Sequence, residues 1–389
     1  MTRRDLWSIA LIVLVALNLR PAITTVGPLL NGIRADLGLS SAGAGALTTL
    51  PVLCFGVFGL LAPSLRRRFP GELLLVAAMT LLATGLLVRT GPTAVTLFAG
   101  TAVAGIAIGV GNVAVPAIIK RDHPARVTLV TAIYSTALTL GASVASGIAV
   151  PIKDATGGGW RLPLGLVAVP ALLAGLAWLA RIRRSTGPAP EVPGPTPQLW
   201  RNRLAWQVTA FMGLQSLLAY VIFGWLPTLC RDRGLSEADA GLVLAVTSFV
   251  QAIGSLLVPA IDRRLRDQRL LVVAVGALTI AGFAGIAWGP IGLIWVSAVV
   301  LGLGQGSGFA LALAFIGLRS GDAHVAARLS GMAQGVGYLI AATGPFAFGL
   351  LHDVTGGWNV PVALAIAIAA LEVLPGLAAG RTRTIRHQP

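Results

Sequence analysis

Long apolar segments recur along the whole chain, and this feature constrains the fold more than any other. Each segment has about 20 or more residues with little charge, which is enough for a helix to cross the roughly 30 Å hydrocarbon core of a bilayer. Of the 389 residues, 56% are hydrophobic and 11% are charged, whereas a soluble domain usually carries about 25% charged residues. The sequence therefore predicts an all-α integral membrane protein.

The hydropathy pattern predicts about twelve membrane-spanning helices. They lie at residues 6–30, 42–65, 72–90, 94–119, 128–151, 162–181, 204–228, 239–261, 270–288, 291–318, 331–351 and 360–379. Between the sixth and seventh spans the chain is rich in proline and polar residues, as is typical of a linker. We expect a six-helix N-terminal half at 1–181, a linker at 182–203, a six-helix C-terminal half at 204–380 and a tail at 381–389.

The net charge of +15 comes from basic residues that are unevenly placed along the chain. When the spans are drawn alternating across the membrane, most of the 29 Lys and Arg residues fall in loops on one side. This is the positive-inside pattern, in which basic loops face the cytoplasm. It predicts a multi-pass plasma-membrane protein with both termini cytoplasmic. The lipid bilayer is then its surroundings, and nucleic acid is excluded as a partner.

The two halves repeat each other at a constant offset. Asp36, Gly38, Leu39 and Ser40 return as Asp232, Gly234, Leu235 and Ser236. A later block, from Asp154 to Pro163, returns from Asp353 to Pro361 with one glycine fewer. Because each half has an even number of spans, the halves run in the same direction and are related by an axis along the membrane normal. Transporters built from such repeats bind substrate near the midplane, between the repeats.

Four motifs in the first and fourth spans are distinctive. The first span carries Asn18-Leu19-Arg20-Pro21 and then Val26-Gly27-Pro28, and the fourth ends with Gly109-Val110-Gly111-Asn112 and Pro116-Ala117-Ile118-Ile119-Lys120-Arg121-Asp122. On these motifs and the repeat, the chain resembles the major facilitator superfamily, and within it the bacterial cyanate and 2-nitroimidazole transporter family. The resemblance implies alternating access by a monomer. Pro63 stands where the superfamily loop usually has an acidic residue, which puts the usual acid-mediated latch between helices in doubt.

Arg20 is the only basic residue that we place near the middle of a span. A charge there costs several kcal/mol and by default marks a functional site. Thr24, one helical turn later, lies on the same face, and Pro21 is expected to bend the helix. The planar guanidinium suits a carboxylate or another small delocalised anion. We predict that Arg20 anchors the substrate. The alternative is a structural arginine that holds helices together through carbonyl groups, Asn18 or Asn112.

Other polar residues in the middle of spans are candidates for substrate contact or for helix–helix hydrogen bonds. They are Asn18, Thr24, Asn112, Tyr134, Gln215, Ser216, Tyr220, Gln305, Gln334 and Tyr338. By the repeat offset, Ser216 and Tyr220 correspond to Arg20 and Thr24. These two residues should therefore occupy the pseudo-symmetric wall of the central site.

Glu372 is the only acidic residue that we place inside a span, toward the cytoplasmic end of the twelfth. It is a candidate proton relay, because proton-driven transporters usually carry an ionisable residue in the membrane. The alternative is a residue that pairs helices or extends to the interface. The sequence predicts no catalytic constellation, no metal site and no cofactor.

These observations predict a secondary transporter and not an enzyme. Its expected partner is a small anionic or dipolar organic solute, and the resemblance implies one that is cyanate-like or nitroimidazole-like. Protons are a further candidate partner. Two alternatives are a multidrug exporter of the same fold, whose pocket would be larger and more aromatic, and a non-transporting membrane sensor, which would carry an appended signalling segment.

Overall fold

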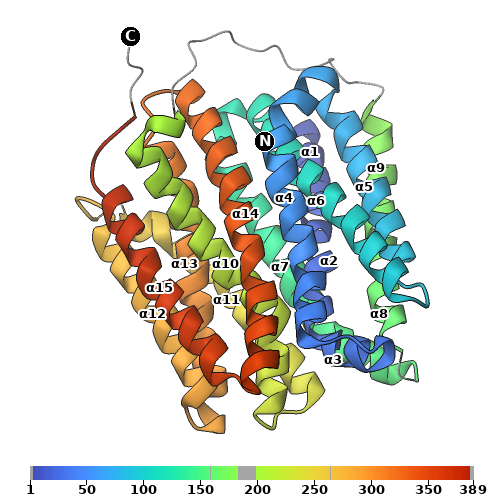
Figure 1. Ribbon diagram of the computed structural model, residues 1–389. Helices are drawn as coiled ribbons and strands as arrows, with labels where there is room; N and C mark the ends of the chain where they lie inside the picture. Colours follow the sequence, from blue (N-terminus) through green and yellow to red (C-terminus); the bar gives the residue numbers. More distant parts are fainter. Residues whose placement is uncertain (1–2, 158, 183–198, 263, 386–389) are drawn as a thin grey trace.

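The computed structural model describes residues 3–157, 159–182, 199–262 and 264–385, and this part of the chain is almost entirely helical (Figure 1). The N-terminal half contains α1 (Arg3–Leu19), α2 (Pro21–Thr24), α3 (Val26–Leu37), α4 (Ser41–Arg68), α5 (Gly71–Val88), α6 (Ala94–Asp122), α7 (Val127–Ala155), α8 (Arg161–Leu166) and α9 (Ala168–Ile182). The C-terminal half contains α10 (Arg203–Asp232), α11 (Glu237–Asp262), α12 (Arg269–Trp288), α13 (Ile294–Leu318), α14 (Ala323–Thr355) and α15 (Asn359–Ala379). Short 3₁₀ turns at Pro124–Arg126, Leu199–Arg201 and Ile291–Leu293 connect some of them.

Twelve helical segments of the described chain are long and apolar enough to cross a membrane, as the sequence predicted. The segments α1 to α3 together form the first span, and α8 with α9 forms the sixth. Several helices run beyond the predicted spans: α14 covers Ala323–Thr355, where 331–351 was expected. Hydropathy marks only the apolar part of a helix, whereas backbone hydrogen bonding continues through the polar turns at each end.

All the spans run roughly side by side, and they define two ends of the molecule (Figure 1). The start of α1, the end of α9, the start of α10 and the end of α15 lie together at what we call the terminus end. The opposite end, where α3 ends and α4 begins, is called the far end. Most of the expected linker, residues 183–198, lies outside the described residues. Asn202, directly before α10, caps this helix. Its side chain accepts hydrogen bonds from the N–H groups of Leu204 and Ala205 at 2.9 and 3.2 Å.

The first span is interrupted twice. Helix α1 ends at Leu19, and α2 begins at Pro21, with Arg20 between them. Pro21 has no N–H group to continue the helical ladder, and the N–H groups of Ile23 and Thr24 both bond to the carbonyl of Arg20. A second break follows at Thr25. The helix is therefore interrupted at the residue that carries the charge.

The sequence repeat corresponds to a repeated set of contacts at the far end. The indole N–H of Trp160 donates to Asp36 at 3.0 Å, and that of Trp358 donates to Asp232 at 2.8 Å. Gly38 and Gly234 end the preceding helices with φ of 63° and 101°, a conformation that favours glycine. The repeated Asp, Gly and Trp residues thus build the same corner in each half.

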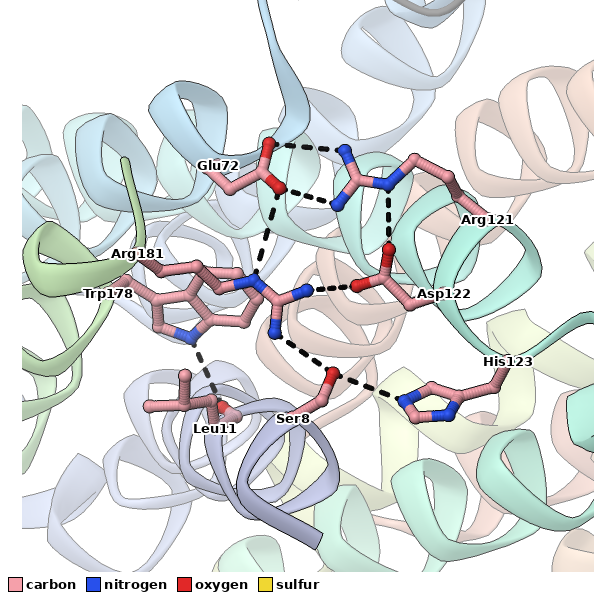
Figure 2. Close-up of polar contacts among 8 residues, drawn as sticks. All are labelled: Ser8, Leu11, Glu72, Arg121, Asp122, His123, Trp178 and Arg181. Atoms are coloured by element: carbon pink, nitrogen blue, oxygen red, sulfur yellow. Dashed lines mark hydrogen bonds and ion pairs between the residues drawn. The ribbon is translucent and has the colours of Figure 1, made fainter. Parts of the chain in front are cut away.

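A network of charged residues ties four helices together at the terminus end of the N-terminal half (Figure 2). Glu72 at the start of α5 accepts two bonds from Arg121 of α6, at 2.5 and 3.2 Å. Arg121 also donates to Asp122, which accepts a bond from Arg181 of α9. Arg181 reaches Ser8 of α1 at 2.9 Å, and His123 is 3.1 Å from the same hydroxyl. The end of α6 is therefore held to α5, α9 and α1 by ion pairs and hydrogen bonds.

At the terminus end of the C-terminal half, a different set of contacts is formed around one buried arginine. Arg319, at the end of α13, is 4% exposed and donates to the side chain of Gln268 and to the carbonyl of Ala379 at 2.6 Å. Burial lowers the pKa of Arg319, and the nearby Asp262 and Asp267 oppose this shift. The first residues of the predicted tail also bind here, because the N–H of Ile385 donates to the carbonyl of Arg319 at 2.8 Å.

Candidate substrate site

A small cavity, partly open to solvent, lies between the two halves. It is lined by residues of both halves, which come from the α1–α2 break and from helices α7, α10, α11, α13 and α14. They are Arg20, Thr139, Gln215, Ser216, Ala219, Tyr220, Gln251, Ser255, Gly306, Phe309 and Tyr338. Five residues predicted from the sequence are therefore brought together: Arg20, Gln215, Ser216, Tyr220 and Tyr338. A central cavity with one arginine and several hydroxyl and amide groups can hold a small polar ligand.

Arg20 provides the only formal charge among the lining residues. Its guanidinium carbon lies 5.4 Å from the ring centre of Phe223 and 5.6 Å from that of Phe309. No carboxylate within the described residues forms an ion pair with it. Two aromatic rings attract a cation but do not neutralise it. The five N–H donors of Arg20 are therefore available to an anion that enters the cavity.

An aromatic cluster forms one wall of the cavity. Tyr220 and Tyr338 have ring centres 6.2 Å apart, and Phe55 of α4 lies 6.0 and 5.9 Å from them. The rings meet at steep angles, an arrangement that aromatic pairs prefer. Tyr220 and Tyr338 line the cavity, and Phe55 packs against both of them.

Amide side chains form a second wall, built within the C-terminal half. The amide N–H₂ of Gln215 lies 3.2 Å from the carbonyl oxygen of Gln305 and 3.4 Å from its side-chain oxygen. Gln305 in turn donates to Thr279 at 3.4 Å, and Ser216 bonds to Gln215 at 3.4 Å. Gln305 is therefore placed behind the lining residues, where it orients Gln215.

The remaining predicted residues do not line this cavity. Thr24 is fully buried and donates to the carbonyl of Ala142 at 3.2 Å, and Asn18 donates to the carbonyl of Leu14 at 2.7 Å. The hydroxyl of Tyr134 donates to Asn112 at 3.2 Å. Gln334 donates to Ser330, one turn away, at 2.8 Å. Each of these contacts is a hydrogen bond within a helix or between helices, the alternative that the sequence left open.

Four polar or aromatic residues of the cavity were not predicted: Thr139, Gln251, Ser255 and Phe309. A signal for two of them was present, because Gln251 and Ser255 are four residues apart and form a polar stripe on an otherwise apolar helix. Thr139 follows Ser135 at the same spacing. Phe309 gave no such signal, since an aromatic residue in an apolar span is ordinarily part of the packing.

The two halves are in close contact between this cavity and the far end. A Cβ on Gly27 of α3 would lie 2.3 Å from the carbonyl oxygen of Phe223 of α10, so these backbones touch. Farther out, Asp353 of α14 accepts hydrogen bonds from the first N–H groups of α4, those of Ser41 and Ala42, at 3.1 and 2.7 Å. Lys153 of α7 pairs with Glu237 of α11 at 2.5 Å. These contacts hold the two halves together at the far end.

Comparisons with known proteins agree with this architecture. The model of the Major Facilitator Superfamily matches residues 10–345. The chain is 41% identical to the 2-nitroimidazole transporter of Escherichia coli (strain K12), over 97% of this chain and 96% of that protein. It is 31% identical to the cyanate transport protein CynX of the same organism, over 89% of this chain and 90% of that protein.

The fold is also found among solved structures. The crystal structure of a D-xylose-proton symporter superposes with a TM-score of 0.77 and covers 98% of this chain and all of that one. The two sequences are 13% identical. At that level the similarity establishes the arrangement of helices, and the chemistry of the cavity has to be derived from the residues of this chain.

Proposed function

Because this chain belongs to the Major Facilitator Superfamily and is one of its transporters, we propose that it moves a small, planar, anionic or strongly dipolar solute across the bacterial inner membrane. The two halves rock about the central cavity, and Arg20 binds the solute. The observation that carries the proposal is the position of Arg20: a positive charge in a central cavity, with aromatic rings beside it and no carboxylate to neutralise it. Such a charge is stabilised when an anion binds.

The names of two relatives indicate the chemical class of the substrate. Their names specify 2-nitroimidazole and cyanate, which are both small, flat and delocalised, with nitrogen or oxygen atoms at the edge. A guanidinium can bond to two such edge atoms at once, and the aromatic side chains of Tyr220 and Tyr338 line the same cavity. Both features favour this class of solute over a sugar or a peptide.

The orientation is part of the proposal. Basic loops are expected to face the cytoplasm, and this puts the terminus end of the bundle inside the cell. The far end, closed by Asp353 and by the Lys153–Glu237 pair, then faces the periplasm. The structure is accordingly assigned to a state whose cavity is shut toward the outside.

The proposal is tested by ligand-induced stabilisation of the purified protein. Cyanate and 2-nitroimidazole are added to the wild type, Arg20→Ala and Arg20→Lys, and unfolding is followed on heating. A ligand that binds only the folded state at 100 times its Kd stabilises it by about 2.7 kcal/mol. We expect stabilisation of the wild type, at least about tenfold weaker binding by Arg20→Ala, since a charged hydrogen bond contributes roughly 1.5–3 kcal/mol, and an intermediate result for Arg20→Lys.

Arg231→Ala is the matched control. Arg231 is exposed and belongs to the C-terminal half, which contributes most of the residues that line the cavity. It removes one positive charge without altering the site, and its ligand response should equal that of the wild type. Equal stabilisation of Arg20→Ala and the wild type would contradict the assigned role of Arg20.

The aromatic wall supports one second candidate, a multidrug exporter. Phe55, Tyr220 and Tyr338 form a cluster that could also hold a bulky apolar cation, although Arg20 would repel its charge. Stabilisation by hydrophobic cations that persists in Arg20→Ala, with no response to cyanate or 2-nitroimidazole, would favour the exporter.

A further inference from the structure

Gln251 of α11 lines the cavity and has an unused hydrogen-bond donor. The residue is 6% exposed, and its amide nitrogen Nε2 is buried without a hydrogen-bond partner among the described residues. An amide N–H₂ group offers two donors, and the great majority of buried polar groups in proteins are bonded. The exception at Gln251 is therefore a group for which a bound solute can supply the partner.

Other polar side chains of the cavity are already bonded inside the protein. Thr139 donates to a carbonyl of its own helix at 2.9 Å, and Ser255 donates to the carbonyl of Gly306 at 2.8 Å. The amide nitrogen of Gln215 lies 3.2 Å from the carbonyl oxygen of Gln305. Their donors are in use, which distinguishes them from the amide on α11.

The backbone around Gln251 is held firmly against α13. A Cβ on Gly306 would lie 2.0 Å from the carbonyl oxygen of Gln251 and 2.6 Å from its Cα, so the two helices touch at this residue. On the next turn, the hydroxyl of Ser307 donates to the carbonyl of Gly254 at 3.1 Å. The amide group is thus carried by a rigid wall, and such preorganisation lowers the cost of binding.

Arg20 and Gln251 come from different halves and approach the same turn of α13. The guanidinium carbon of Arg20 lies 5.6 Å from the ring centre of Phe309. Phe309 follows Gly306 by three residues, which is about one helical turn, and Gly306 is the residue that touches Gln251. Arg20, Gly306, Phe309 and Gln251 all line the cavity. A solute bound there can be contacted from both halves.

We infer that Gln251 is a second solute contact and that it selects a flat nitrogen heterocycle with acceptor atoms at two edges. The inference rests on the proposed function. Arg20 bonds to the polar group at one edge, such as a nitro group, and the amide of Gln251 donates to a ring nitrogen at the other edge. The last torsion of a glutamine side chain is broad, so the N–H₂ group can turn toward the ring while α11 stays in place.

An unused buried donor has a consequence for stability that is independent of any solute. Leaving a buried donor unsatisfied destabilises a fold, and replacing it by an apolar group of similar size is neutral or stabilising. Without solute, Gln251→Leu should therefore melt at the same temperature as the wild type or at a higher one. A residue kept at the expense of stability is typical of a binding site.

Two solutes test the contact: 2-nitroimidazole, and 2-nitrothiophene, which has the nitro group but no ring nitrogen. Their Kd values are measured by calorimetry for the wild type, Gln251→Leu, Arg20→Ala and the control Gln207→Leu. Gln207 is a half-buried glutamine near the start of α10, about two turns before Gln215. If Gln251→Leu does not fold, Gln251→Met, with an unbranched side chain of similar length, takes its place.

We expect the wild type and Gln207→Leu to bind 2-nitroimidazole about three- to tenfold more tightly than 2-nitrothiophene, roughly the factor that one neutral hydrogen bond contributes. A site built to hydrogen-bond its substrate rejects an analogue that lacks the bonding group. Gln251→Leu should lose this preference and bind both solutes equally. Arg20→Ala should bind both about tenfold more weakly, because both carry the nitro group.

An unchanged preference in Gln251→Leu, together with weaker binding by Arg20→Ala, would overturn the inference and leave the proposed function standing. A clearly lower melting temperature of Gln251→Leu without solute would also overturn it, because the amide would then stabilise the fold through a partner of its own. If the wild type binds cyanate but not 2-nitroimidazole, the inference fails alone. If it binds neither, the proposed function fails with it.

Discussion

At the scale of single residues, the ionisable side chains inside the helix bundle fall into two groups. Glu72, Arg89 and Arg319 are each bound by side chains or backbone carbonyls: Arg89, for example, donates to the carbonyl of Ala22 at 2.6 Å. Arg20 and Glu372 have no such partner in the described structure. A charge with fixed partners stabilises the fold it is bound to, whereas one without partners is free to respond to a ligand or a proton.

The first prediction concerns the charged network of Figure 2. Arg181→Ala removes bonds to Asp122 and Ser8, while Asp122 and Glu72 keep their bonds to Arg121. Loss of one partner from a largely buried ion pair costs roughly 3–5 kcal/mol, and we expect the low side of this range because the side chain of Arg181 is 21% exposed. The melting temperature in detergent should fall by several degrees.

Arg126→Ala is the control for this experiment. Arg126 lies at the same end and pairs with Asp5 at 3.9 Å, but its side chain is 45% exposed, and such surface pairs contribute about 0–1 kcal/mol. Its melting temperature should be close to that of the wild type. Similar decreases in melting temperature in both variants would mean that the bonds of Arg181 stabilise the fold no more than a surface ion pair does.

At the scale of the helices, small residues let the backbones approach closely. In α13, Gly302 and Gly306 face α11, where a Cβ would lie 2.6 Å from the carbonyl oxygen of Thr247 and 2.0 Å from that of Gln251. Gly304, on another face, approaches Thr279 of α12. Helices in membranes associate through such small-residue contacts, since lipid gives little hydrophobic drive between them. The glycine-rich segment of α13 is therefore a packing surface.

The second prediction compares two glycines of the same helix. Gly306→Ala places a methyl group against the backbone of Gln251, so α11 and α13 have to separate, which typically costs about 1–3 kcal/mol. Gly317→Ala meets nothing within 4 Å and should be neutral or stabilise the helix by up to about 1 kcal/mol. Thermal unfolding of both variants measures the difference. Equal stability would show that α11 and α13 do not need their close contact.

At the scale of the whole molecule, the contacts at the far end decide whether the cavity is reached from that side. Asp353 accepts bonds from the two N–H groups at the start of α4 and acts as a cap supplied by the other half. Negative charge is favourable at the start of a helix. Lys153 and Glu237 join α7 to α11 at the same end. Both contacts have to break when the far end opens.

The third prediction follows from this closure. Cysteines at Lys153 and Glu237, in a chain whose Cys54 and Cys230 are replaced by alanine, should be joined by a short thiol cross-linker. Cross-linking should stop cyanate uptake in proteoliposomes, and cleavage of the linker should restore it. The matched pair is Trp288→Cys with Asn359→Cys, two residues that contact each other within the C-terminal half at 2.9 Å. Uptake that continues with the 153–237 pair fully cross-linked would contradict rocking of the halves at this end.

Much of the architecture was predictable from local sequence. The number of spans depends on hydropathy alone, and the twofold repeat is visible in the blocks around Asp36 and Asp232. The break at Arg20 follows from Pro21, because proline removes a helical hydrogen bond wherever it stands. The isolation of Arg20 was also predictable, since the sequence places no acidic residue at its depth.

The tertiary structure alone decided which polar residues share the cavity with Arg20. Thr24 was expected beside Arg20, yet its hydroxyl bonds to α7, whereas Thr139 and Gln251 line the cavity. Glu372 was assigned to a span from the sequence, but only the tertiary structure shows that its carboxyl group is buried without a hydrogen-bond partner among the described residues. The physical reason is that hydropathy records depth in the membrane, while the direction of a side chain depends on the rotation of its helix. That rotation is set by close contacts with neighbouring helices, which are distant in the sequence.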